Sequence, residues 1–219
     1  MTPNNLVNMA KLLGLDVIAL TDHNTSLNCE AAMAVGDAVG VLVIPGMELT
    51  TSEDIHAVCL FPTLEKALAF SEYVDANRIK VKNKSEIYGE QIIMNEDDKA
   101  VGEIEHLLLP ASFISIMDAY QKVKEFGGIC YPAHIDRDSL SILSVLGEID
   151  PCCGFKTAEL ADLSKLDALR QQHPILDAMN IVNCSDAHYL ENMREAHNTL
   201  DLPGLTREAV LSYLDAPKQ

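Results

Sequence analysis

The chain has 219 residues, of which 48% are hydrophobic, and a mean hydropathy of +0.07. This composition suits one domain with a full-sized core and excludes fibrous and largely disordered classes. The 16 basic and 33 acidic residues leave a formal net charge of −17, which makes a duplex nucleic acid an unlikely partner, because binding it requires lysine and arginine at the phosphates. No apolar run reaches the ~20 residues that cross a bilayer. The first residues do not resemble a signal peptide, so we expect a cytoplasmic protein without membrane partners.

Helices and strands are expected to alternate along the first part of the chain. A first helix begins at Thr2 and Pro3, residue types that suit a helix N-terminus, and ends at Gly14. The next expected elements are a strand at 16–20, a helix at 27–39, strands at 41–51 and 55–61, and a helix at 64–79.

Residues 80–112 are polar and lack a clear period, so we interpret them as an irregular excursion or small cap within a single domain spanning 1–219. The expected elements beyond it are a helix at 114–126, a strand at 129–134, a helix at 140–146, a possible strand at 156–160, a helix at 163–172, a strand at 180–184 and a helix at 206–214. Repeated β–α units with apolar strands favour parallel strands covered by helices, which is an α/β fold.

The cysteines are expected to be buried free thiols. No CxxC pair occurs, the chain is long enough to fold without disulfides, and several cysteines lie inside apolar strands, where they behave as small hydrophobic residues. The six are Cys29, Cys59, Cys130, Cys152, Cys153 and Cys184.

Several expected strands are followed by residues that bind metals or transfer protons. In an α/β sheet or barrel, the loops at the carboxyl ends of the strands open on one side, so functional residues gather there. The residues that follow a strand in this way are Asp22, His23, Glu48, His134, Asp186 and His188.

His56 instead begins a strand. If residues 48–51 and 55–60 form a hairpin, Glu48 lies directly opposite His56, with the two Cβ atoms ~5 Å apart. A carboxylate and an imidazole at that separation can share one metal ion.

The predicted metal ligands are His23, Glu48, His56, His134, Asp186 and His188. A mixed nitrogen and oxygen ligand set favours Zn, Mn or Fe over Ca or Mg. Each residue alone has a structural alternative, since a strand-end histidine is often hydrogen-bonded and an aspartate often caps a helix or forms a turn. The remaining histidines, at positions 106, 173 and 197, are interpreted as structural or surface residues.

These segments resemble the PHP family, named for polymerase and histidinol phosphatase domains. The resemblance covers most of the chain and rests on the segments GLDVIALTDHN, PGMELTT, IHAVCLF, YPAHIDR and NCSDAH, in the order of the family. It implies a distorted seven-stranded β/α barrel, up to three metal ions (usually Mn, Zn or Fe) and hydrolysis of phosphate esters.

The chain departs from the family pattern at one place, because the opening strand with its His-x-His motif is absent from the sequence. Glu48, His56 and His134 match one complete three-ligand site of the family. His23 and His188 match a second site that lacks one ligand, and Glu48 with Asp186 match a third that lacks its imidazoles. We therefore expect a barrel without its first strand, its gap covered by a second copy of the chain or by residues encoded upstream.

The function favoured by these residues is hydrolysis of a small phosphorylated substrate, a phosphate monoester or nucleotide, by metal-activated water. The catalytic candidates are Asp22, His23, Arg137 and His188. Arg137 can bind a phosphate through paired hydrogen bonds, or form a surface ion pair with a neighbouring aspartate. The alternative function is a metal-binding module without full catalytic activity, with a regulatory or oligomeric role. A nuclease is favoured less, because basic groove residues are lacking.

Overall fold

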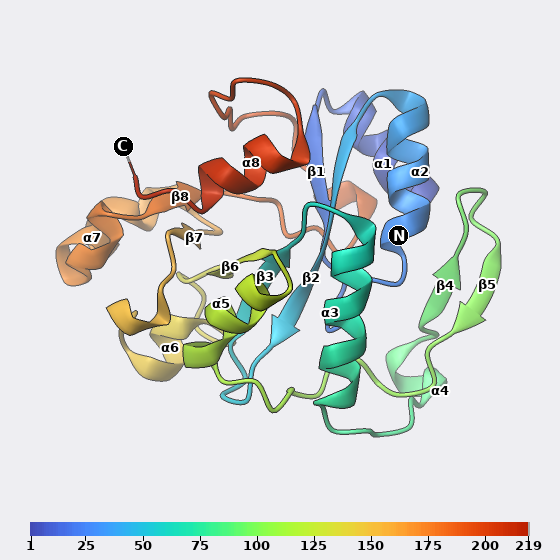
Figure 1. The fold of residues 1–219 in the computed structure, drawn as a ribbon, viewed down its shortest axis with the longest axis horizontal. Coiled ribbons are helices and arrows are strands. Elements are labelled where there is room, and N and C mark those ends of the chain that lie inside the picture. Colours follow the sequence, from blue (N-terminus) through green and yellow to red (C-terminus); the bar gives the residue numbers. More distant parts are fainter. Residues whose placement is uncertain (219) are drawn as a thin grey trace.

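A four-stranded sheet in the order β1-β2-β3-β6 forms the centre of the computed structural model, which describes residues 1–218 (Figure 1). Its strands are β1 Val17–Leu20, β2 Leu42–Thr50, β3 His56–Leu60 and β6 Ile129–Pro132. β1 and β2 are parallel, whereas β3 is antiparallel to both β2 and β6. The sheet is therefore mixed. The antiparallel β2–β3 pair agrees with the expected hairpin, whereas the antiparallel β3–β6 pair corrects the expectation of parallel strands elsewhere.

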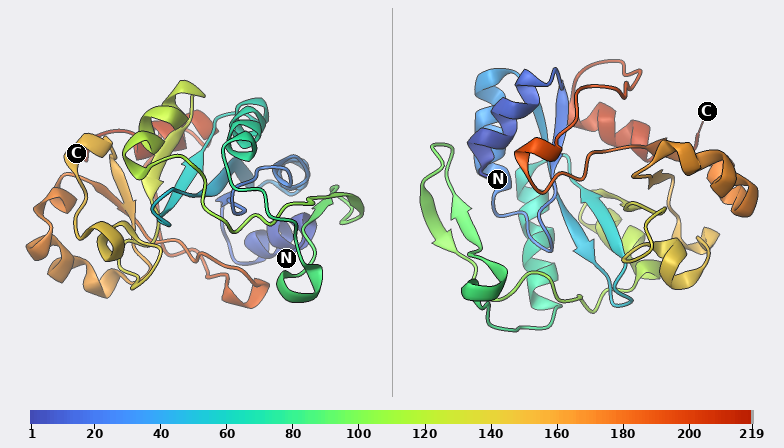
Figure 2. Two further views of the ribbon diagram at one scale, coloured as in Figure 1. Left: turned by 90° about the horizontal axis from the view of Figure 1, so that it is seen from below. Right: turned by 180° about the vertical axis from the view of Figure 1, so that it is seen from behind.

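Helices cover both faces of this sheet (Figure 2). The main helices are α1 Pro3–Leu12, α2 Cys29–Val39, α3 Leu64–Ala76, α5 Ile116–Glu125, α6 Ile142–Leu146, α7 Leu166–Gln172 and α8 Arg207–Leu214. Short 3-10 helices lie at η1 Pro151–Cys153, η2 Leu163–Lys165, η3 Pro174–Asp177 and η4 Leu190–Asn192. The predicted helices are all present, with ends that differ by a few residues at most.

A second, two-stranded parallel sheet joins β7 Thr157–Glu159 to β8 Asn180–Val182. Within residues 1–218 this pair is not hydrogen-bonded into the four-stranded sheet. The fold is thus mixed α/β with small open sheets, and the predicted distorted seven-stranded barrel without its first strand is not confirmed.

Burial explains why β2 and β3 read as continuous apolar runs in the sequence. Every residue of β3 is buried, and so is every residue of β2 after Leu42. One face of these strands packs on α3 and α5 through residues such as Met47, Cys59 and Phe70. The other face packs Val58 and Leu60 against α8, and that second face also carries Glu48 and His56.

Residues 80–112 form a short helix, α4 Ser85–Tyr88, and a hairpin of β4 Ile92–Met94 and β5 Ala100–Glu103. The hairpin lies beside α1 and α2 (Figure 1). The carboxylate of Asp98 at its turn accepts hydrogen bonds from the Thr2 hydroxyl and from the backbone N–H of Asn4 (2.9 Å). The excursion therefore caps the N-terminus of α1.

The six cysteines are free thiols, as predicted, but two of them, Cys152 and Cys184, are exposed rather than buried. Among the described residues, no helix combines the length and apolar character that crossing a bilayer requires.

Gly46 is required by the close approach of β2 and β3. A Cβ atom at this position would overlap the carbonyl oxygen of Cys59 and lie 2.8 Å from a methyl group of Leu60.

We expect Gly46→Ala to lower the free energy of unfolding by ~1–3 kcal/mol, as overpacking usually does, in denaturant titrations of the purified protein. Gly204→Ala is the control, because an added Cβ there meets no atom within 4 Å. Equal stability of the two variants would contradict this packing.

Candidate metal centre

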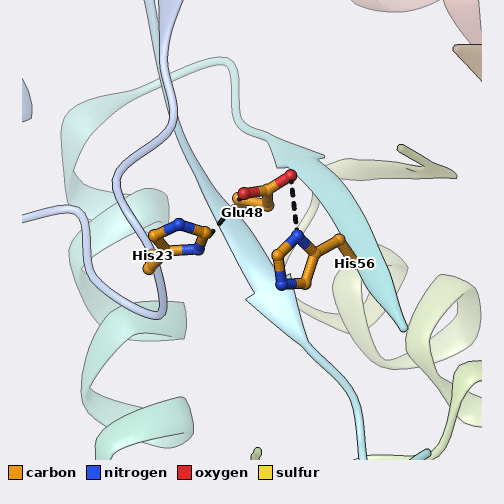
Figure 3. Close-up of side chains that lie close together, drawn as sticks. All are labelled: His23, Glu48 and His56. Atoms are coloured by element: carbon orange, nitrogen blue, oxygen red, sulfur yellow. Dashed lines mark ion pairs between the residues drawn. The ribbon is translucent and has the colours of Figure 1, made fainter. Parts of the chain in front are cut away.

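The buried carboxylate of Glu48 lies among three imidazoles. Its Oε2 is 3.1 Å from Nδ1 of His23, and its Oε1 is 3.3 Å from Nδ1 of His56 (Figure 3). His134 approaches from β6, with Nε2 3.4 Å from Oε1 of Glu48 and 3.3 Å from Nδ1 of His56. The structure thus brings together four of the six predicted ligands in one cluster.

Strand direction explains this convergence. His23 follows β1 and forms a parallel bridge to Glu48 on β2. Because β3 is antiparallel to β2 and β6, its first residue, His56, lies at the same edge of the sheet as the last residues of its neighbours. A histidine that begins a strand therefore meets histidines that follow strands.

The predicted register of the β2–β3 hairpin is wrong by two residues. His56 pairs with Thr50, and Glu48 pairs with Val58. The shift leaves Glu48 and His56 on the same face, because side chains on a strand alternate with a period of two. The two residues consequently meet diagonally across the hairpin.

Left-handed backbone conformations occur at three non-glycine residues of the site. Asn24, beside His23, has φ 51°, His134 has φ 28° and Asp186 has φ 45°. Such conformations cost free energy and persist where the surroundings hold them. The Asn24 side chain shows one such restraint, since its Oδ1 accepts the backbone N–H of Thr50 (2.9 Å).

Asp186 and His188 lie in the loop after β8. The ring centroid of His188 is 5.8 Å from that of His23, and the side chain of His188 is 57% exposed. Nη2 of Arg137 is 2.7 Å from Oδ2 of Asp186. Arg137 therefore pairs with a site residue and not with its chain neighbours Asp136 or Asp138.

Asp22 is placed differently from the imidazole cluster. Its carboxylate accepts a hydrogen bond from the side chain of Asn28 (3.4 Å), at the N-terminus of α2. Burial raises the pKa of Asp22. Its backbone carbonyl accepts from the N–H of Glu48 (3.1 Å), so Asp22 contributes to the register of β1 on β2.

The surroundings shift the pKa values of Glu48 and His23, the carboxylate and one imidazole of the cluster. Burial alone would raise the pKa of Glu48, but hydrogen bonds from His134 and His56 hold that pKa well below its ordinary value. Burial lowers the pKa of His23, and nearby His56 and His188 lower it further. The site at neutral pH thus contains an ionised carboxylate beside a neutral imidazole, which is the form that ligates metals.

These residues fit a divalent cation. His23, Glu48 and His56 offer ligand atoms that all lie within 4.8 Å of one another. Nδ1 of His23 is buried and lies close to Glu48, yet it makes no hydrogen bond among residues 1–218. A cation bound between the imidazole nitrogen and the carboxylate oxygen would satisfy both, and nitrogen with oxygen ligands suits Zn, Mn or Fe.

Glu159, the last residue of β7, was not predicted from the sequence. It is 4% exposed, and burial, followed by the charges of Asp186 and Glu48, raises its pKa to about 8. Glu159 ends a possible strand, and the same kind of position made Glu48 a predicted ligand. The strand is only three residues long, which made that signal weak.

The other histidines lie apart from the cluster. His106 forms a bridge with Lys82 in the excursion, and His173 follows α7. His197 contacts the side chain of Asn183 through Nε2 (3.0 Å). Their interpretation as structural or surface residues agrees with these positions.

The raised pKa of Glu159 predicts a pH-dependent cost to stability. The unfolded chain ionises Glu159 above pH ~4.5, whereas the folded protein keeps it protonated up to about pH 8. The folded state therefore loses stability as pH rises through this window, by up to ~5 kcal/mol. We expect Glu159→Gln to stabilise the metal-free protein more at pH 8 than at pH 5 in denaturant titrations. The exposed Glu148→Gln is the control, and a pH-independent difference would contradict the prediction.

Comparisons with solved structures find the same overall fold in several proteins. No protein-family model matches the sequence. The lesion-specific endonuclease PfuEndoQ of Pyrococcus furiosus superposes with a TM-score of 0.65 and 19% identity, over 98% of this chain and 51% of its own. A candidate metal-dependent phosphoesterase of Bifidobacterium adolescentis superposes with a TM-score of 0.59 and 19% identity, over 96% of this chain and 90% of its own. An amidohydrolase of Chromobacterium violaceum, with bound sulfate and no metal, superposes with a TM-score of 0.61 and 16% identity, over 92% of this chain and 87% of its own.

Sequence similarity reaches only part of the chain. The uncharacterized protein MJ1587 of Methanocaldococcus jannaschii is 32% identical over 74 residues, which cover 33% of this chain and 43% of that protein. This chain thus spans about half the length of the P. furiosus endonuclease and matches less than half of the archaeal relative. The structural matches establish a shared fold. Because one of them is an endonuclease, the expectation that nucleic acid is an unlikely partner is not supported.

Proposed function

From this shared fold and the cluster around Glu48, we propose that the chain is a metal-dependent phosphoesterase acting on a small phosphorylated substrate. The observation that carries the proposal is a buried carboxylate within 3.1–3.4 Å of three imidazole nitrogens. The match to a candidate metal-dependent phosphoesterase over nearly the whole of both chains supports the same class.

Glu48, His56 and His134 are the proposed ligands of one cation, and His23 with His188 contribute to a second position. A bound divalent cation would supply hydroxide near neutral pH and offset the charge of the phosphoryl oxygens. Asp186 is a further proposed ligand, since its Oδ1 lies 3.8 Å from Nδ1 of His188, while its Oδ2 pairs with Arg137.

Arg137 is the proposed phosphate-binding residue. Its side chain is 43% exposed, and its guanidinium is paired with the Asp186 carboxylate at 2.7 Å. A guanidinium binds phosphoryl oxygens through several N–H groups held in one plane. The ion pair with Asp186 therefore positions a cationic fork at the edge of the cluster.

Removal of one imidazole should lower both the metal content and the rate of turnover. We expect His134→Ala to lose one equivalent of Zn or Mn by elemental analysis, and hydrolysis of p-nitrophenyl phosphate to fall at least ~100-fold. His173→Ala, outside the cluster, should retain both. Circular dichroism of each variant separates loss of the site from loss of the fold.

The same experiment distinguishes the alternative function. If the protein is a metal-binding module without catalysis, the wild type will bind the cation but will hydrolyse neither p-nitrophenyl phosphate nor other small esters. Metal-dependent turnover retained in His134→Ala would contradict the assigned centre itself.

Arg137→Ala tests phosphate binding separately from metal binding. We expect KM for p-nitrophenyl phosphate to rise ~10–100-fold, because a hydrogen bond to a charged group contributes ~1.5–3 kcal/mol. The metal content should stay at the wild-type value. An unchanged KM would show that Arg137 only pairs with Asp186.

A further inference from the structure

Asn24 directly follows His23 and is almost completely buried, with 1% of its surface exposed. Its backbone N–H donates to the carbonyl oxygen of Glu48 (2.9 Å), and its φ of 51° lies in the left-handed region. Asparagine adopts this conformation more readily than most residues. The chain therefore turns at Asn24 while it is still hydrogen-bonded to β2.

The side-chain amide of Asn24 joins two other segments to this turn. Its Oδ1 accepts the backbone N–H of Thr50 (2.9 Å), the last residue of β2. Its Nδ2 donates to the carbonyl oxygens of Leu108 (2.7 Å) and Pro110 (3.2 Å), near the end of the excursion. Both N–H groups and the carbonyl oxygen of the amide are thus used inside the protein.

The part of the excursion that Asn24 binds is held on both sides. Before it, the buried guanidinium of Arg78 donates from Nη1 to the carbonyl oxygen of Leu107 (2.6 Å). After it, the backbone N–H of Ser112 donates to the carbonyl oxygen of Thr50 (2.9 Å). The two carbonyl groups that accept from Asn24 are therefore fixed in place, and they fix the amide in turn.

Each segment next to this amide carries or adjoins a member of the cluster. His23 is its chain neighbour, Glu48 lies two residues before Thr50, and Thr50 pairs with His56 across the hairpin. Nδ1 of His23 is 3.1 Å from Oε2 of Glu48, but it makes no hydrogen bond among residues 1–218. The position of this nitrogen therefore depends on the backbone at residues 23 and 24.

We propose that Asn24 is a positioning residue of the metal centre, which holds His23 and Glu48 at a separation that one cation can bridge and fastens the centre to the excursion. The inference rests on the metal centre of the proposed function. In this role Asn24 acts through the backbone beside the ligands, and its own side chain binds no cation. Replacement of residues that orient metal ligands commonly weakens metal binding ~10–100-fold.

Titration of the metal-free full chain with Co(II) tests this role, because the visible absorption of Co(II) reports both its binding and the geometry of its ligands. We expect Asn24→Gly to raise the Kd for Co(II) ~10–100-fold and to change the absorption bands at saturating Co(II). Glycine keeps the left-handed backbone but removes every side-chain hydrogen bond, so the variant isolates the contribution of the amide.

Asn180→Gly is the matched control. The side chain of Asn180 also donates to two backbone carbonyl oxygens, those of Tyr213 (3.3 Å) and Ala216 (2.7 Å). Asn180 begins β8, whereas the loop that approaches the cluster follows the other end of this strand. We expect this variant to lose stability in denaturant titrations and to keep the Kd and the Co(II) spectrum of the wild type.

Asn24→Asp gives a second test if Asn24→Gly does not fold. Aspartate keeps the acceptor for the N–H of Thr50 but loses both donors to the excursion, and its charge faces the carbonyl oxygens of Leu108 and Pro110. An added negative charge by itself favours cation binding. A Kd that rises in this variant as well, with a changed spectrum, would therefore support displaced ligands.

Two results would overturn the assignment while leaving the metal centre intact. A wild-type Kd and spectrum in Asn24→Gly would show that the amide only stabilises the fold. An equal loss of affinity in Asn24→Gly and Asn180→Gly would show a general effect of lowered stability. If the wild type bound no Co(II), the proposed metal centre itself would fail, and the positioning role with it.

Discussion

The architecture of the site depends on one buried negative charge. Glu48 is 6% exposed, and its ionised carboxylate is surrounded by His23, His56 and His134. Removing such a charge from water costs several kcal/mol unless paired groups or a metal ion compensate. Neutral imidazoles compensate only in part, and a divalent cation would do so fully. The same arrangement therefore accounts for the depressed pKa of Glu48, for the unsatisfied nitrogen of His23 and for the proposed chemistry.

The sheet topology makes this concentration of ligands possible. β1, β2 and β6 end on the side of the sheet where the antiparallel β3 begins, so the four strands bring side chains to one place. Left-handed backbone at Asn24, His134 and Asp186 turns the chain sharply at these positions. Tight packing behind the site, for example at Gly46, fixes the spacing of β2 and β3. His23, Glu48, His56 and His134 lie at or beside the ends of strands, whereas Asp186 and His188 lie in the loop after β8.

Much of this arrangement could be predicted from the sequence, because buried strands and strand-end ligands leave strong local patterns. The helices, the central strands and the convergence of His23, Glu48, His56 and His134 belong to that part. The antiparallel pairing of β3 with β6 could not be read from apolar runs, since parallel and antiparallel strands share that pattern when both faces are buried. The hairpin register also depends on the turn, which the residue pattern of 51–55 does not determine. Glu159 was not predicted because its burial and raised pKa depend on neighbours from other segments of the chain.

The most direct test of the account is an anomalous-difference map from crystals grown with Mn or Zn. The account predicts a peak bonded to Glu48, His56 and His134, with metal–ligand distances of ~2.0–2.2 Å. A map with full-occupancy metal elsewhere on the molecule, or with these three side chains hydrogen-bonded only to one another in the presence of the cation, would contradict it.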